Sequence, residues 1–172
     1  LCGERSPHMD PDLSGSFVGL SCATDRYQLA RAVMEGVTYS LRQVVDLMGE
    51  AQQEDGYLDT YYIINGLENR FTNLRDNHEL YCLGHMLEAA VAYHQATGKD
   101  KLLAIGCAYA DCVAREFGTE PGKRRGYPGH EVAELALVKL YHVTGNEAYL
   151  RLASYFIDER GQTPNYFALE EA

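Results

Sequence analysis

The sequence lacks any apolar run close to the roughly 18 residues that a membrane-spanning helix requires, and its start does not resemble a signal peptide. It is also poor in basic residues, with 15 Lys and Arg against 25 Asp and Glu and a net charge of −10. Nucleic-acid binding depends on a concentrated basic face, which this balance does not favour. We therefore expect neither a membrane nor a nucleic-acid partner.

Cysteines are few, and their spacing lacks the C-x-x-C pattern of many metal and redox sites. There are five of them, and an odd number favours reduced, partly buried thiols over a disulfide framework. We expect a cytoplasmic protein in which Cys107 and Cys112 are small core residues. Because the chain begins with Leu1 rather than Met, we also expect it to be an excerpt of a longer gene product.

The first 48 residues combine a turn-rich loop with one amphipathic helix. The stretch "GERSPHMDPDLSGSFVGLS" is rich in Gly and Pro, which predicts a loop with at most one short strand. Asp25 stands where a helix N-cap belongs, and the apolar residues from Leu29 to Met48 follow helical spacing. The simplest interpretation is a loop that leads into a surface helix.

This stretch also resembles part of the C-terminal lobe of xylulokinase-type sugar kinases, the FGGY carbohydrate kinases. The residues that fit the second signature of that family are Gly15, Phe17, Gly19, Leu20, Gln28, Leu29, Ala32, Val33, Met34 and Glu35. The resemblance implies a kinase whose catalytic Asp and Gly-rich ATP-binding loops lie in other parts of the protein. Phosphoryl transfer depends on those parts, so we expect no kinase activity from this chain alone.

A repeat with an offset of 47 residues follows residue 50. When Thr97-Gly98 is laid on Thr144-Gly145, the apolar residues of the flanking segments also align. Each Thr-Gly predicts a helix end with Gly in the left-handed conformation, and a Gly-His pair stands near the start of each preceding helix. A period of about 40 to 50 residues with two helices per unit is typical of stacked antiparallel helical hairpins.

Two fold families share this pattern, namely open solenoids of the TPR or HEAT kind and closed (α/α)6 toroids. Asp76 and Glu79 have the spacing of a capping box at the start of the first helix. Polar and aromatic residues gather at helix starts or in the loops before them, which favours a toroid with a sugar-sized pocket; they are His78, Tyr81, His85, Tyr127 and His130. We predict a mainly α fold, a partial (α/α)6 toroid preceded by a loop and one helix.

Long blocks after residue 50 resemble glycoside hydrolase family 127, the bacterial β-L-arabinofuranosidases. They include "AQQEDGYLDTYY", "TNLRDNHELYCLGHMLEAAVAYHQATGKDKLL" and "GKRRGYPGHEVAELALVKLYHVTGNEAYLRLASYFIDERGQTPNYF". The resemblance implies an (α/α)6 catalytic barrel, followed by β-sandwich domains, that acts on terminal β-L-arabinofuranose of plant glycans. We therefore expect a chimera of two partial proteins, with a xylulokinase-like fragment at 1–48 and a partial glycoside hydrolase barrel at 49–172.

The family resemblance also implies which residues contact the sugar. The family uses a cysteine nucleophile held by a zinc site of cysteines and a glutamate, with a separate glutamate as acid/base, and these motifs lie beyond the stretch matched here. We therefore expect no catalytic residue, no metal ligand and no cofactor in this chain, and zinc in the full-length family. The expected substrate-binding residues are His78, His85 and His130, with Tyr127, Gln53, Asp55 and Tyr57 as weaker candidates.

The prediction that follows is a partial glycoside hydrolase that carries one wall of the sugar pocket and is inactive by itself. We expect it to bind an arabinofuranosyl sugar weakly and to self-associate through helical faces that an incomplete toroid leaves exposed. Two alternatives stay open, namely a fragment of a xylulokinase-like carbohydrate kinase and a non-enzymatic helical-repeat module that binds a peptide.

Overall fold

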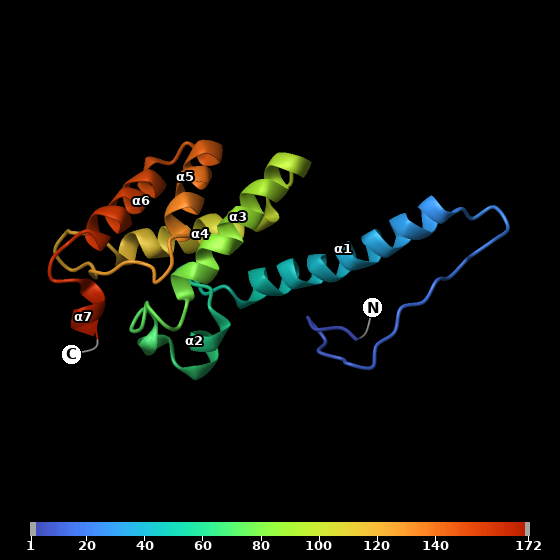
Figure 1. The fold of residues 1–172 in the computed structure, drawn as a ribbon, viewed down its shortest axis with the longest axis horizontal. Helices are drawn as coiled ribbons and strands as arrows, with labels where there is room; N and C mark the ends of the chain where they lie inside the picture. The colour runs from blue at the N-terminus through green and yellow to red at the C-terminus, as the bar shows by residue number, and fades with distance from the viewer. Residues whose placement is uncertain (1–2, 171–172) are drawn as a thin grey trace. The chain divides into compact units, whose positions relative to one another are not determined.

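The computed structural model describes residues 3–170, and its internal contacts divide the chain into two compact units, Leu1–Glu50 and Ala51–Ala172. The described residues form helices and loops without a strand, which confirms the mainly helical prediction (Figure 1). Within residues 3–170, none of the helices is both long and apolar enough to span a membrane. The assignment of residues 1–48 and 49–172 to two different parent proteins stays a prediction.

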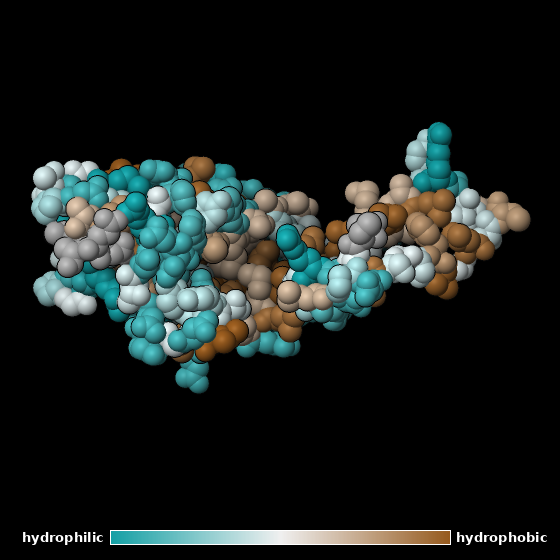
Figure 2. Space-filling view, turned by 60° about the horizontal axis from the view of Figure 1, so that its bottom comes forward, coloured by the Kyte–Doolittle hydropathy of each residue, from teal (hydrophilic) through white to brown (hydrophobic). Residues whose placement is uncertain are grey.

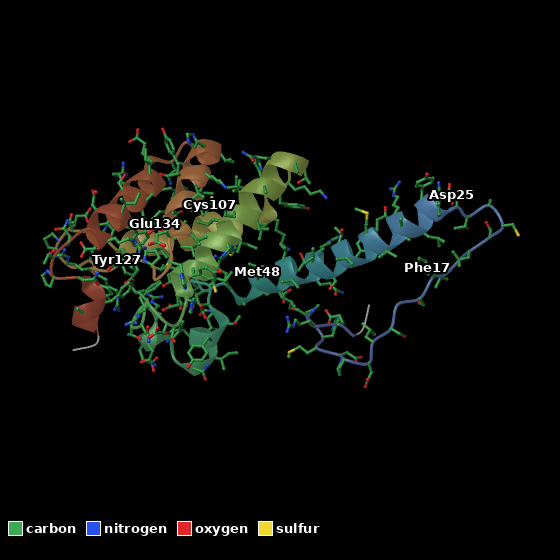
Figure 3. The ribbon with its side chains drawn as sticks, in the orientation of Figure 1. Phe17, Asp25, Met48, Cys107, Tyr127 and Glu134 are labelled. Carbon is green, nitrogen blue, oxygen red and sulfur yellow. The ribbon has the colours of Figure 1, made fainter. Side chains whose placement is uncertain are left out.

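The N-terminal unit consists of an extended loop and the long helix α1, Arg26–Ala51. The carboxylate of Asp25 accepts hydrogen bonds from the backbone amides of Tyr27 and Gln28, so the predicted N-cap is confirmed (Figure 3). Residues 3–25 contain no strand, so this stretch is the predicted loop. Its few backbone hydrogen bonds, among them Gly3 to Leu13 and Glu4 to Asp10, do not form a ladder.

Helix α1 has no buried side chain, although apolar residues follow its length. Met34 is 71% exposed and Leu41 is 60% exposed. The space-filling view shows apolar residues at the surface of this unit (Figure 2). The N-terminal unit therefore presents apolar surface that it does not cover by its own folding.

The C-terminal unit is built from helical hairpins. Its elements are α2 (Thr60–Asn65), the 3-10 turn η1 (Leu67–Asn69), α3 (Glu79–Thr97), α4 (Lys101–Glu116), α5 (Ala133–Thr144), α6 (Glu147–Arg160) and α7 (Tyr166–Glu170). Helices α3 and α4 form one hairpin, and α5 and α6 form the next. The first helices of the two hairpins, α3 and α5, pack on each other, and so do α4 and α6. The predicted stack of hairpins is therefore present.

Glycines end the first helix of each hairpin, as the two Thr-Gly pairs predict. Gly98 has φ 68° and Gly145 has φ 72°, and their amides donate to the carbonyls of His94 and Tyr141. Glycine adopts this left-handed conformation without the steric cost that a Cβ would bring. Both hairpin turns thus follow from local sequence.

The core of the C-terminal unit lies between α3, α4, α5 and α6. Fully buried side chains come from each of the four helices, among them Leu80, Leu83, Leu87, Tyr109, Leu137, Leu140 and Phe156. Each of these aliphatic and phenylalanine side chains contributes about 1.5–3 kcal/mol when it leaves water. Cys112 is buried and Cys107 is half-buried, as expected of core residues, while Cys2 lies outside the described residues.

The predicted capping box at the start of α3 is wrong. The helix begins at Glu79, and its N-cap is His78, with φ 60° and no capping hydrogen bond from its side chain. The carboxylate of Glu79 is buried and accepts hydrogen bonds from the hydroxyl of Tyr57 and the amide of Phe71. It is therefore committed to a tertiary contact, which local spacing could not reveal.

Candidate functional site

Four rings gather at the start of α3 and in the loop before α5. The His78 and His130 rings have centroids 5.2 Å apart and planes tilted by 27°, and Tyr81 lies 5.6 Å from His78 and 5.1 Å from His130. The ring of His85 lies 4.5 Å from that of Tyr81. All three histidines are exposed. The structure thus brings the three sequence-predicted histidines into one solvent-facing cluster, which we call the histidine cluster.

Two glycines allow the segments that carry these histidines to meet. A Cβ at Gly84 would lie 2.8 Å from the backbone nitrogen of Ala133, so α3 and the start of α5 approach with no room for a side chain. A Cβ at Gly129 would lie 2.7 Å from the carbonyl oxygen of Arg75. Each glycine directly precedes a histidine of the cluster. The repeated Gly-His pair is therefore the sequence signal for this site.

Hydrogen bonding fixes the tautomers of the two facing histidines. The Nδ1 atom of His78 contacts the carbonyl oxygen of Asp76, and because a carbonyl only accepts, Nδ1 carries the proton. The Nε2 atom of a neutral His78 is then an acceptor, and the Nε2–H of His130 donates to it over 3.3 Å. With these tautomers, Nδ1 of His130 is also an acceptor. The two rings therefore offer both a hydrogen-bond donor and hydrogen-bond acceptors to a ligand.

A buried carboxylate belongs to the residue that directly follows His78 in the sequence. Glu79 follows His78 and is 0% exposed, and its carboxylate ties Tyr57 to the segment that begins at Phe71. Burial raises the pKa of Glu79 from its ordinary 4.5 to about 7, against the opposing effect of the two hydrogen bonds. Sequence reasoning placed Glu79 in a capping box and missed its burial, because a Glu in the first helical turn is ordinarily exposed to solvent near the helix dipole.

Tyr57 and Tyr127 lie in the core and outside the exposed cluster. Tyr57 is 0% exposed, and its ring packs edge-on against Phe71. Tyr127 is 1% exposed, donates its hydroxyl hydrogen to Asn165 over 3.0 Å and lies beneath the Arg160 guanidinium. Both hydroxyls have partners within the chain, so in this structure neither ring presents a surface to a ligand.

Asp55 and Gln53 are half-buried in the loop that follows α1. Burial raises the pKa of Asp55, but the hydrogen bond from Arg70 and the nearby charge of that guanidinium outweigh this effect and lower it. The side-chain amide of Gln53 donates to the carbonyl of Ala51 over 2.8 Å. Both side chains hold the loop together and do not join the histidine cluster. Sugar contact stays a prediction for all seven residues named from the sequence.

The described cysteines do not fit the zinc site that the family resemblance implies. Within residues 3–170, no group of three or more His, Cys, Asp or Glu side chains is arranged to hold a metal ion. Burial raises the pKa of Cys112 to about 11, and it raises the pKa of Cys82 and of Cys107 as well. Zinc is bound by thiolates, so these neutral thiols are poor ligands, and we derive no catalytic step through zinc in this chain.

Comparison with known proteins places the chain among glycoside hydrolases. The family model described as "Beta-L-arabinofuranosidase, GH127 catalytic domain" matches residues 3–171. A non-reducing end β-L-arabinofuranosidase of Bifidobacterium longum subsp. longum is 49% identical over 130 residues, which are 73% of this chain and 20% of that protein. The chain thus spans about a fifth of the length of this relative.

Two solved structures share both fold and sequence with the chain. The GH127 β-L-arabinofuranosidase Ara127N-Se from Geobacillus stearothermophilus T6 superposes with a TM-score of 0.72 and 58% identity, over 76% of this chain and 20% of that one. The GH127 β-arabinofuranosidase BT3674 gives a TM-score of 0.70 and 41% identity, over 76% of this chain and 22% of that one. GH127 enzymes have an α/α toroid fold, so the predicted fold class is confirmed.

The second predicted resemblance is also present. A xylulose kinase of Staphylococcus epidermidis is 41% identical over 71 residues, which are 41% of this chain and 14% of that protein. A xylulose kinase of Bacillus subtilis is 45% identical over 51 residues, or 30% of this chain and 10% of the kinase. The chain therefore resembles proteins of two unrelated activities, each over a fraction of their length.

Proposed function

Because this chain belongs to the family of GH127 β-L-arabinofuranosidase catalytic domains, we propose that it is part of such a domain and presents one wall of its sugar pocket. The observation that carries the proposal is the histidine cluster, in which His78, His85 and His130 share one exposed site with Tyr81. The ligand that we propose is a terminal β-L-arabinofuranosyl residue.

The chemistry of the cluster suits a furanose. Each sugar hydroxyl both donates and accepts hydrogen bonds, and a neutral imidazole does the same through its two nitrogens. His130 and His78 already form one donor–acceptor pair, so a hydroxyl placed between them can accept from His130 and donate to His78. The Tyr81 ring beside them adds an apolar face for the C–H groups of the sugar.

We expect binding without turnover. The chain spans about a fifth of its glycosidase relative, and glycoside hydrolysis needs a proton donor and a nucleophile or base on either side of the scissile bond. The histidine cluster lies at the start of α3 and in the loop before α5, and it supplies only one side of such an arrangement. A weak complex with millimolar affinity is the expected result, because a few hydrogen bonds to an open surface add little net free energy.

Calorimetric titration with methyl β-L-arabinofuranoside tests this proposal. In His85→Ala and His130→Ala we expect affinity to fall about 2- to 10-fold, since each lost hydrogen bond removes about 0.5–1.5 kcal/mol. His142→Ala is the matched control, because His142 is an exposed histidine in the last turn of α5, at the opposite end of that helix from the cluster. Equal loss in the control, or no loss in either cluster variant, would contradict the proposed site.

The two alternatives give different results in the same calorimeter. The xylulose kinase relatives support a kinase fragment. Because the ATP-binding loops of that family lie in other parts of the protein, such a fragment would bind neither ATP nor the arabinofuranoside. A helical-repeat module would bind a peptide with an affinity that neither His85→Ala nor His130→Ala changes. We expect neither result, because the exposed polar rings gather at one end of the packed helices and do not form a continuous stripe along them.

A further inference from the structure

We propose that the Nε2 atoms of His78 and His130 form a two-histidine site for a borderline divalent transition-metal ion such as Ni²⁺, Cu²⁺ or Zn²⁺. The two atoms face each other at 3.3 Å, and the ring centroids are 5.2 Å apart. Imidazole nitrogen is a preferred ligand of these ions. The site uses no cysteine and is different from the thiolate zinc site that the family resemblance implies.

The spacing of the two rings matches the geometry of two ligands on one ion. Nitrogens that each lie about 2.05 Å from a metal at a tetrahedral angle are about 3.3 Å from each other. If both rings direct the Nε2 lone pair at the ion, their centroids are about 5.2 Å apart. Both observed distances agree with these values. An ion can therefore enter between the rings without moving either backbone segment.

The partner of the other nitrogen in His78 supports the same conclusion. Histidines that bind metals donate the hydrogen of their second ring nitrogen to a carbonyl or carboxylate, which orients the ring and directs the lone pair at the ion. Nδ1 of His78 already contacts the carbonyl of Asp76 in this way. His130 needs only to move its proton from Nε2 to Nδ1, at the cost of one long hydrogen bond between the two rings.

The surroundings of the pair determine which ion binds and how tightly. Both histidines are exposed, so an ion reaches them from solvent. Within residues 3–170 no third His, Cys, Asp or Glu completes the set, so water fills the other positions. Affinity should therefore be modest and follow ligand preference, with Cu²⁺ above Ni²⁺ and Zn²⁺, and with Mg²⁺ and Ca²⁺ far weaker. The proposal does not depend on sugar binding.

Titration of the chain with NiCl₂ in sugar-free buffer tests the site by calorimetry. We expect one Ni²⁺ per chain in the wild type and at least a 10-fold loss of affinity in His130→Ala and in His78→Asn. Asparagine is chosen at position 78 because it tolerates the left-handed backbone found there. His142→Ala is the control for a histidine outside the cluster and Cys82→Ser is the control for a cysteine, and both variants should bind Ni²⁺ like the wild type.

A second readout guards against variants that fold poorly. Paramagnetic Ni²⁺ should broaden the imidazole NMR signals of His78 and His130 in the wild-type chain at substoichiometric amounts, and should leave that of His142 sharp. Broadening of all histidine signals alike, or unchanged affinity in His130→Ala, would overturn the proposal. Because no sugar is present, either result leaves the arabinofuranoside titration free to support or contradict the pocket.

Discussion

Replacing Glu79 by Gln is expected to change how the stability of the chain depends on pH. The wild-type carboxyl is fully buried, and its pKa is raised from 4.5 to about 7 because burial disfavours the charged form. A raised pKa means that the folded chain holds this proton more tightly than the unfolded chain. Its contribution to stability is complete below about pH 4.5 and is lost as the pH rises through about 7.

The size of the effect follows from the pKa shift. A shift of one pKa unit corresponds to about 1.36 kcal/mol, so the shift from 4.5 to about 7 corresponds to roughly 3 kcal/mol in total, of which about 2.5 kcal/mol falls between pH 5 and pH 8. A glutamine cannot ionise but still offers a carbonyl oxygen to the Tyr57 hydroxyl or the Phe71 amide. The variant should therefore keep one of the two contacts and lose the pH dependence.

Urea unfolding followed by circular dichroism at several pH values between 5 and 8 measures the effect. Buffers contain EDTA, so that no metal ion contributes. The free energy of unfolding of Glu79→Gln minus that of the wild type should rise by about 2–3 kcal/mol across this range. Subtraction removes the titration of all groups common to both chains. Parallel pH profiles would refute the reasoning and show that folding does not raise the pKa of Glu79.

Two further predictions concern packing and association. Gly84→Ala should destabilise the C-terminal unit by about 1–3 kcal/mol in urea unfolding, because the new Cβ would lie 2.8 Å from the nitrogen of Ala133. The control is Gly36→Ala, which should be neutral or stabilising because a Cβ there meets nothing within 4 Å. The exposed apolar residues of α1 should make the chain self-associate. Leu41→Glu should therefore lower the mass that light scattering measures at high protein concentration. An unchanged mass would show that the apolar residues of α1 do not mediate self-association.

Local signals in the sequence predicted the parts of the fold that local chemistry decides. The helix ends at Gly98 and Gly145 and the N-cap at Asp25 all depend on residues within one turn of each other. The capping box from Asp76 failed for the opposite reason. Its second member, Glu79, is buried in the core, where its carboxylate accepts a hydrogen bond from the Tyr57 hydroxyl. The sequence next to Glu79 gives no signal of this contact.

The part of the candidate site that the sequence predicted is the part that repeats in the two hairpins. Gly84-His85 and Gly129-His130 occupy similar places in successive hairpins, and the structure gives the reason, since each glycine stands where backbones nearly touch. Whether an aromatic residue near such a site faces inward or outward depends on tertiary packing. Tyr57 and Tyr127 were therefore expected beside the pocket, whereas they are buried in the core.

The most direct test of the central claim is to observe the histidine rings while the sugar is added. Imidazole NMR spectra of the wild-type chain, recorded with increasing methyl β-L-arabinofuranoside in EDTA-containing buffer, report each ring separately. The signals of His78, His85 and His130 should shift together along one saturable curve, while that of His142 stays in place. If no cluster signal moves, or if His142 moves equally, this chain does not present a sugar-binding wall at the start of α3 and α5.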